Sequence, residues 1–229
     1  MTMKTKIASL LSAAALIATG ASAGTITPIG TPASNPTPDG QVLQNNHGEI
    51  LGDIFGGTFV ANGVNFSNGV VEVTRVDDDN DQTYDFLEWE AHAVARWAGA
   101  NQGFGTGDGK IFDVTGQFSA VTGQILGQPG GEGIEFVRYG DENGTVTAST
   151  NPASNPNGQD HAVTYTWTVN GVPAANRYLI FFEDSNESSV YTDTDYNDLV
   201  VEVIGTPIPE PGSLALIGLG GLAMLRRRR

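Results

Sequence analysis

The sequence contains no cysteine, so no disulfide can stabilise it, and a domain of this size must rely on its own core or on bound metal. Basic residues are also few, because six of the 11 lie at the two ends, at Lys4, at Lys6 and among the last four residues. Five remain to balance 26 acidic residues. A surface this acidic repels nucleic acid and anionic lipid, which excludes both as expected partners. It suits a calcium-rich extracellular setting, although a role in solubility explains it equally well.

No apolar run is long enough to span a bilayer comfortably, yet each end of the chain carries a short one. Residues 7–18 are almost wholly apolar, and Ala21 and Ala23 offer the small side chains that a signal peptidase accepts. This pattern predicts a secretory signal peptide at residues 1–23, cleaved before Gly24. Because no cysteine follows the cut, a lipid anchor is not expected there.

The pattern between the two ends predicts an all-β fold. Glycine is abundant, with 30 residues, and Asn-Gly pairs separate short apolar runs. Strands are expected at 57–61, 69–76, 84–97, 111–119, 133–139, 144–149, 162–170, 176–183 and 198–204. This number of short strands predicts a single jelly-roll-like β-sandwich domain over residues 41–205. Residues 24–40, rich in Pro, Thr and Gly, are expected to form a flexible lead-in.

The segment 84–97 is ambiguous, because its Ala, Glu and Leu residues favour a helix. Its apolar residues nevertheless recur at every second position, and the expected buried face carries Leu87, Trp89, Ala91, Ala93, Ala95 and Trp97. The opposite face carries Glu88, Glu90, His92 and Arg96. A helix would place the two tryptophans on different faces, so a long half-buried strand is predicted, with His92 at the surface.

Residues 206–229 form a distinct tail. Its residues are the triplet Pro209, Glu210 and Pro211, a short apolar helix expected at 214–225, and the terminal Arg226, Arg227, Arg228 and Arg229. The arginines are expected to stay cytoplasmic, so that the run contacts the inner membrane transiently. The tail resembles the PEP-CTERM sorting signal. That resemblance implies cleavage by an exosortase and a final location at the cell surface or outside the cell, in species that make exopolysaccharide and biofilm.

The first acidic cluster, VDDDNDQTYDFLEW at 76–89, spaces its carboxylates as a calcium-binding loop does. With Asp77 at position one, Asp79 and Asp81 occupy positions three and five. Gln82 stands at position six, where such a loop needs glycine for its sharp turn, and the predicted strand removes the helix that would follow. Calcium ligation by the three aspartates and a solvated acidic turn both remain open interpretations.

The second acidic cluster occupies residues 181–203, where one apolar strand ends and another begins. Its polar residues are Glu183, Asp184, Asp193, Asp195, Asn197 and Asp198. Such close carboxylates repel one another unless they are solvated or bridged by a cation. A loop that returns toward the first strand would gather oxygens from both strand ends, as calcium requires, whereas the alternative is a turn capped by local side chains. The expected calcium ligands here are Asp184, Asp193, Asp195 and Asp198.

The same stretch resembles the closing motif, F-E-D followed by D-x-D-Y-N-D, of an uncharacterised bacterial extracellular domain family. That resemblance implies a β-rich, calcium-associated module. No H-E-x-x-H or G-x-S-x-G motif occurs, and a pair such as Glu88 and Glu90 is more often solvated surface than a glycosidase site. The sequence thus predicts a non-enzymatic matrix or surface protein, associated with exopolysaccharide and stabilised by calcium. The alternatives are a glycan hydrolase or a carbohydrate-binding module that stacks sugars on Trp89, Trp97, Trp167 and Tyr196.

Overall fold

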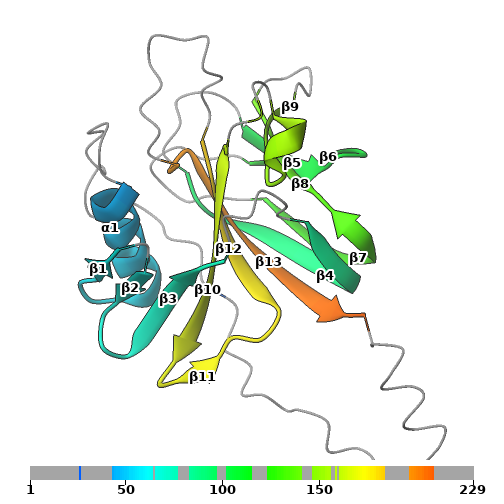
Figure 1. The fold of residues 1–229 in the computed structure, drawn as a ribbon. Helices are drawn as coiled ribbons and strands as arrows, with labels where there is room; N and C mark the ends of the chain where they lie inside the picture. The colour runs from blue at the N-terminus through cyan, green and yellow to red at the C-terminus, as the bar shows by residue number, and fades with distance from the viewer. Residues whose placement is uncertain are drawn as a thin grey trace, which may run out of the picture.

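The computed structural model describes residues 26, 43–63, 65–76, 83–96, 102–114, 123–140, 146–155, 158, 160–183 and 196–208. Within these residues the chain forms two antiparallel sheets and one α-helix, α1 (Leu43–Phe55), which covers the outer face of the larger sheet (Figure 1). The predicted all-β sandwich is therefore confirmed.

The larger sheet places the last strand of the domain in its interior. In spatial order its strands are β1 (Val60–Asn62), β2 (Asn65–Ser67), β3 (Val71–Arg75), β10 (Ala162–Val169), β12 (Arg177–Phe182), β13 (Leu199–Pro207), β4 (Tyr84–Ala95) and β7 (Gln124–Ile134), with β11 (Val172–Pro173) paired to β10. Because β13 lies between β12 and β4, both of its edges are hydrogen-bonded and its apolar residues are buried on both faces.

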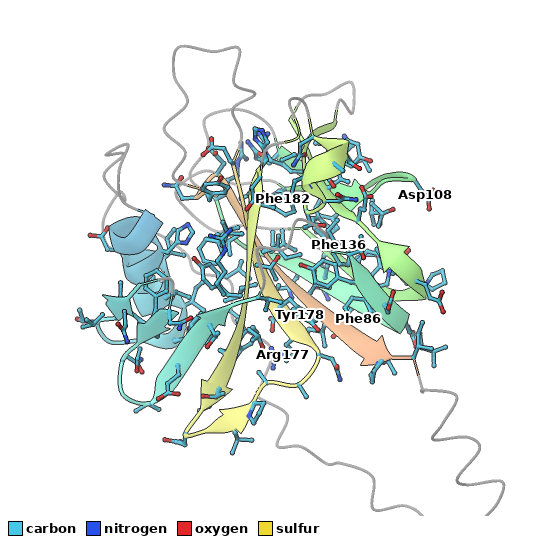
Figure 2. All side chains as sticks on the ribbon, in the orientation of Figure 1. Phe86, Asp108, Phe136, Arg177, Tyr178 and Phe182 are labelled. Carbon is cyan, nitrogen blue, oxygen red and sulfur yellow. The ribbon has the colours of Figure 1, made fainter. Side chains whose placement is uncertain are left out.

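The smaller sheet covers the other face of the larger one. Its strands are β6 (Gly109–Val114), β5 (Gln102–Thr106), β8 (Phe136–Tyr139) and β9 (Val146–Ser149), and the short 3₁₀ turn η1 (Pro152–Ser154) follows. Aromatic rings fill the space between the sheets, among them Phe86, Trp89, Phe104, Phe136 and Phe182 (Figure 2). Full burial of such a side chain contributes roughly 1.5–3 kcal/mol, so this layer is a main source of stability.

Helix α1 lies in a region where no helix is expected from the sequence. Its His47, Ile50 and Leu51 recur at helical spacing and are fully buried against the larger sheet. The helix ends at Phe55, and the next residue, Gly56, takes a φ of 78° and donates its N–H to the Gly52 carbonyl at 2.8 Å. Because glycine and asparagine residues stand among the apolar residues of this segment, the helical spacing is hard to recognise in the sequence.

Strands occur within each predicted range, but four others, β2, β5, β7 and β11, are not predicted. Strands β5 and β7 are rich in glycine, which normally marks turns. In β5 the glycine allows close packing, because a Cβ at Gly105 would overlap the carbonyl of Gly109. Strand β7 lies at the sheet edge, where Pro129 is tolerated although it has no N–H to donate.

Strand β4 is confirmed, but its alternation of buried and exposed residues is interrupted. Its pairing with β13 shifts register between Thr206 and Pro207, and Leu87 lies at this irregularity with 59% of its surface exposed. The prediction of a buried Leu87 is therefore wrong. His92 and Arg96, expected at the surface, are buried because both faces of this half of β4 are covered.

The amino-terminal lead-in contains one described residue, Ile26, and it lies on the larger sheet. Ile26 is 7% exposed, and its N–H donates to Glu202 Oε2 at 3.1 Å. Its carbonyl oxygen is 3.0 Å from His92 Nε2. Glu202 also accepts hydrogen bonds from Arg177 on β12, so a buried charged cluster anchors the start of the chain to β13.

Candidate functional site

One end of the larger sheet gathers polar residues from three neighbouring strands. Strand β10 begins there, β12 ends there and β13 begins there, because Phe182 pairs with both Ala162 and Leu199 (Figure 1). We name this region the acidic end, and its residues are Asp160, His161, Glu183, Tyr196, Asn197 and Asp198. The two halves of the predicted calcium motif leave and re-enter the sheet at this point.

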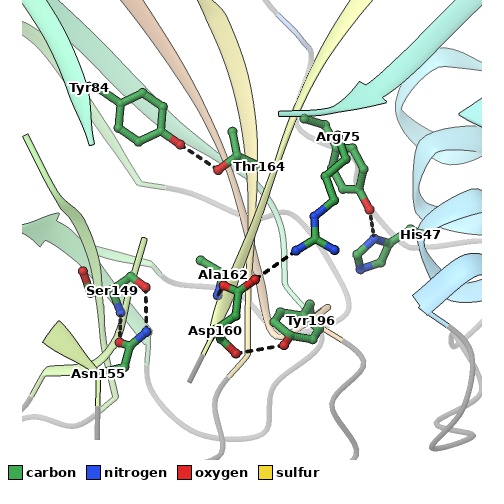
Figure 3. Close-up of polar contacts among 10 residues, drawn as sticks. His47, Arg75, Tyr84, Ser149, Asn155, Asp160, Ala162, Thr164 and Tyr196 are labelled. Atoms are coloured by element: carbon green, nitrogen blue, oxygen red, sulfur yellow. Dashed lines mark hydrogen bonds and ion pairs between the residues drawn. The ribbon is translucent and has the colours of Figure 1, made fainter. Parts of the chain in front are cut away.

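The two halves of the motif contact each other directly. Glu183 is 2% exposed, and its Oε2 accepts the Tyr196 N–H at 3.2 Å. The Tyr196 hydroxyl donates to the Asp160 carbonyl at 2.8 Å (Figure 3), and the Glu183 N–H donates to the His161 carbonyl at 3.0 Å. The chain therefore returns to Glu183 before it enters β13, which is the arrangement that a shared ion site requires.

Tyr196 is the residue through which the returning chain contacts the sheet. Its φ of 52° places it in the left-handed region, which is uncommon for residues other than glycine. Its ring packs against the apolar cluster that contains Phe181, while its N–H and O–H bond to neighbouring strand ends. These contacts hold the backbone in an unfavourable conformation and direct Asn197 and Asp198 into β13.

An arginine pairs with one carboxylate of the acidic end. Arg75, the last residue of β3, has its Nη2 2.9 Å from Asp160 Oδ2, and Asp160 Oδ1 accepts the Ala162 N–H at 3.3 Å (Figure 3). Protein groups thus hold this carboxylate in place. The next residue, Val76, donates its N–H to the Thr164 carbonyl at 2.8 Å, so the chain enters the first acidic segment beside β10 as well.

One of the predicted calcium ligands is described, namely Asp198, which is partly exposed just before β13. The others, Asp184, Asp193, Asp195, Asp77, Asp79 and Asp81, lie outside the described residues. Within the described ranges, no three His, Asp or Glu side chains are grouped so that they could hold a metal ion. The calcium hypothesis therefore depends on carboxylates that adjoin the described part of the acidic end.

His161 is a feature of the acidic end that the sequence does not reveal. It is 3% exposed, and neither ring nitrogen has a hydrogen-bond partner in the part of the chain that the structure describes. A buried polar group without a partner costs roughly 1–3 kcal/mol, so a water molecule or another polar group is favoured there. The sequence carries no signal for this, since His161 stands alone before an apolar run.

Two tyrosines lie on opposite faces of the sheet near the start of β10. The Tyr165 hydroxyl is 2.7 Å from His47 Nδ1, and the Tyr84 hydroxyl is 2.6 Å from Thr164 Oγ1 (Figure 3). Burial raises the pKa of both tyrosines well above the ordinary value, because the phenolate would lose its hydration.

Alkaline pH is therefore expected to destabilise the fold. Both phenols keep their full stabilising effect below a pH of about 10 and lose it as the pH rises toward their higher folded pKa values. Tyr84→Phe should remove one such group and reduce the fall in unfolding free energy by about 1.4 kcal/mol per pH unit above that point. Urea unfolding between about pH 9 and 12 measures this slope. An equal slope in the wild type and the variant would contradict the expectation.

A groove of about 690 Å³ lies between the turn that joins β5 to β6 and the end of β7. Asp108, at the tip of that turn (Figure 2), and Glu132 line it together with glycine-rich backbone. Trp89 also contributes to the lining but is 3% exposed, and Trp167 is 2% exposed. Neither ring can stack on a sugar, so this part of the carbohydrate-binding alternative is wrong, and Trp97 lies outside the described residues.

Comparison with known proteins identifies the tail. Residues 207–229 match the family model of the PEP-CTERM protein-sorting motif, which confirms the resemblance seen in the sequence. No curated protein and no solved structure matches the chain. Several predicted signal residues lie outside the described part, namely Pro209, Glu210, Pro211, Arg226, Arg227, Arg228 and Arg229 of the tail and Ala21 and Ala23 of the leader. Among the described residues, no helix is long and apolar enough to cross a bilayer.

Proposed function

We propose that this PEP-CTERM protein, which an exosortase processes during export, is a non-enzymatic component of the cell surface or extracellular matrix that calcium stabilises at its acidic end. The sorting motif supports export and removal of the tail. The excess of 26 acidic over 11 basic residues suits a matrix in which divalent cations bridge anionic groups. Association with exopolysaccharide or biofilm is the role that the tail implies.

The observation that carries the calcium proposal is the hydrogen bond between the Tyr196 N–H and the Glu183 carboxylate. Asp184 directly follows Glu183 in the chain, and Asp195 directly precedes Tyr196, so each is one residue away from this contact. Carboxylates brought together in this way repel one another. A calcium ion, which takes six to eight oxygen ligands, would remove that repulsion and join the ends of β12 and β13.

Calcium is expected to raise the melting temperature of the purified exported protein. An ion that binds only the folded state adds about 2.7 kcal/mol at 100 times its Kd, which corresponds to about 5–10 °C for a chain of this length. Calorimetry with calcium and with a chelator measures the shift. Asp184→Asn combined with Asp195→Asn should abolish it, because the acidic end loses two ligands.

The matched control is Asp113→Asn, which removes an exposed carboxylate paired with Lys110 on β6 of the smaller sheet. This variant should keep the full calcium shift. If calcium leaves the melting temperature unchanged, the proposal is wrong. A shift that survives in the double variant would place the ion at another site and contradict the assignment to the acidic end.

The groove beside β7 favours a second candidate function, which is carbohydrate binding by hydrogen bonds. Its glycine-rich walls leave backbone amides and carbonyls accessible, and Asp108, Gln128 and Glu132 could bond to sugar hydroxyls. Sedimentation of the protein with purified exopolysaccharide, compared between the wild type and Gln128→Ala, tests this candidate. Equal binding by both proteins would exclude the groove as the site.

A further inference from the structure

The sorting motif overlaps the folded domain. The family match begins at Pro207, which is the last residue of β13 and pairs with Phe86 on β4. Only Ile208 separates this pair from Pro209, where the Pro-Glu-Pro triplet begins. The triplet therefore follows almost directly on the last residue pair of the larger sheet.

The chain between this sheet end and the expected membrane segment is short. Residues 209–213 separate Ile208 from the apolar run that begins at Leu214. Fully extended, they span at most about 18 Å. The headgroup layer on one side of a bilayer occupies roughly 5–8 Å of that length. An enzyme that holds the triplet at the membrane must therefore meet the folded end of β13.

This end of the domain is opposite the acidic end. Strand β13 begins at the acidic end and runs to Pro207, and its nine residues span roughly 30 Å (Figure 1). Phe86, which pairs with Pro207, lies beside the far end of β13 in Figure 2. The tether thus directs one particular face of the sandwich toward the membrane.

Exposed apolar side chains occur at this face. Leu87 is 59% exposed and Ile208 is 36% exposed. Asp85, two residues before Leu87, and Glu88, directly after it, are both exposed. Carboxylates at this position disfavour contact with an anionic lipid surface, so a protein partner fits this face better than the bilayer does.

We infer that Leu87, Pro207 and Ile208 form a sorting face, the surface through which the folded domain docks on the exosortase. This inference rests on the proposed processing of the tail by that enzyme. Leu87 and Ile208 supply the apolar contact. The pairing of Pro207 with Phe86 fixes the distance from this contact to the Pro-Glu-Pro triplet.

The test follows tail removal from the full chain by pulse-chase in cells that contain the exosortase. Leu87→Ser is expected to slow processing about fivefold while leaving thermal unfolding unchanged, because an interface residue is lost and no core contact is. The matched control is Val60→Ser, since Val60 is 69% exposed on β1 at the opposite edge of the same sheet. Val60→Ser should be processed at the wild-type rate.

A flexible insertion separates docking from other effects. Gly-Ser-Gly-Ser-Gly placed between Ile208 and Pro209 lets the triplet reach the enzyme independently of the sorting face, so Leu87→Ser should have no further effect in that chain. The inference is overturned if Leu87→Ser does not slow processing, or if Val60→Ser slows it equally. It is also overturned if Leu87→Ser slows processing as much with the insertion as without it. Replacing Pro209, Glu210 and Pro211 by alanine tests the proposed function separately, because normal processing of that variant would exclude exosortase recognition itself.

Discussion

Replacing Glu202 by alanine is expected to lower the free energy of unfolding by about 3–5 kcal/mol, because a buried arginine loses this carboxylate. Glu202 is fully buried on β13, and Arg177 Nε donates to its Oε1 at 2.7 Å. Arg177 is 6% exposed and lies over Trp167, with 5.4 Å between the guanidinium carbon and the ring centroid. Alanine would leave the guanidinium inside the protein while removing its counter-charge.

The same carboxylate also holds the amino-terminal segment. Glu202 Oε2 lies 3.1 Å from the Ile26 nitrogen and 3.2 Å from His92 Nε2. Both neighbours of His92 Nε2, this carboxylate and the Ile26 carbonyl, are acceptors, so that nitrogen is assigned the hydrogen. Loss of Glu202 should therefore also release Ile26, and limited proteolysis near the amino terminus should become faster.

Glu72→Ala is the control for Glu202→Ala, since Glu72 is exposed on β3 of the same sheet. Its effect on urea unfolding should stay within about 0.5 kcal/mol. Glu202→Gln keeps the size of the side chain and one acceptor oxygen, so its effect should fall between those of the two alanine variants. Equal unfolding free energies for Glu202→Ala and Glu72→Ala would contradict the assigned role of the buried cluster.

Gly130→Ala is expected to cost about 2–4 kcal/mol and to weaken the pairing of β7 with β4. A Cβ at Gly130 would overlap the backbone carbonyl of Phe86, which cannot move without displacing β4 itself. The neighbouring Gly131 offers a matched control, because nothing lies within 4 Å of the position that its Cβ would take. Gly131→Ala should change stability by less than about 0.5 kcal/mol.

Thermal unfolding of the two glycine variants measures this difference, and hydrogen exchange of the β7 amides locates it. Faster exchange in β7 of Gly130→Ala, with the amides of β10 and β12 still protected, would show that the edge strand has loosened. Two variants of equal stability would mean that β7 can shift without cost, which contradicts the close approach at Gly130.

The strands that the sequence predicts best are those buried on both faces, because nearly all of their residues must then be apolar. Strands β12 and β13 are apolar at consecutive positions, because α1 covers one face of the sheet and the smaller sheet covers the other. Strands β5 and β7 are not predictable in this way, since their glycines serve contacts between strands that only the tertiary structure creates. Leu87 is misplaced for a similar reason, because a one-residue shift of register reverses the faces of all residues beyond it.

The candidate site is predictable where its residues adjoin strands that follow one another in the chain. Glu183 and Tyr196 flank two successive apolar strands, so an antiparallel turn must bring them together. The cluster of Arg177, Glu202 and His92 is different, because its members come from three strands that are far apart in the chain. A single glutamate within the run LVVEV is the one signal that could have indicated a buried charge at that place.

The interior position of β13 has a consequence for the timing of folding. In a chain exported from its amino terminus, residues 199–207 are the last part of the larger sheet to be delivered. Until they arrive, β4 and β7 have no partner to join them to β12, and the larger sheet exists as two separate pieces. The hydrogen bond between Ile26 and Glu202 also cannot form earlier, because Glu202 lies 176 residues further along the chain. The protein therefore completes its fold only when the residues that directly precede its sorting motif have been exported.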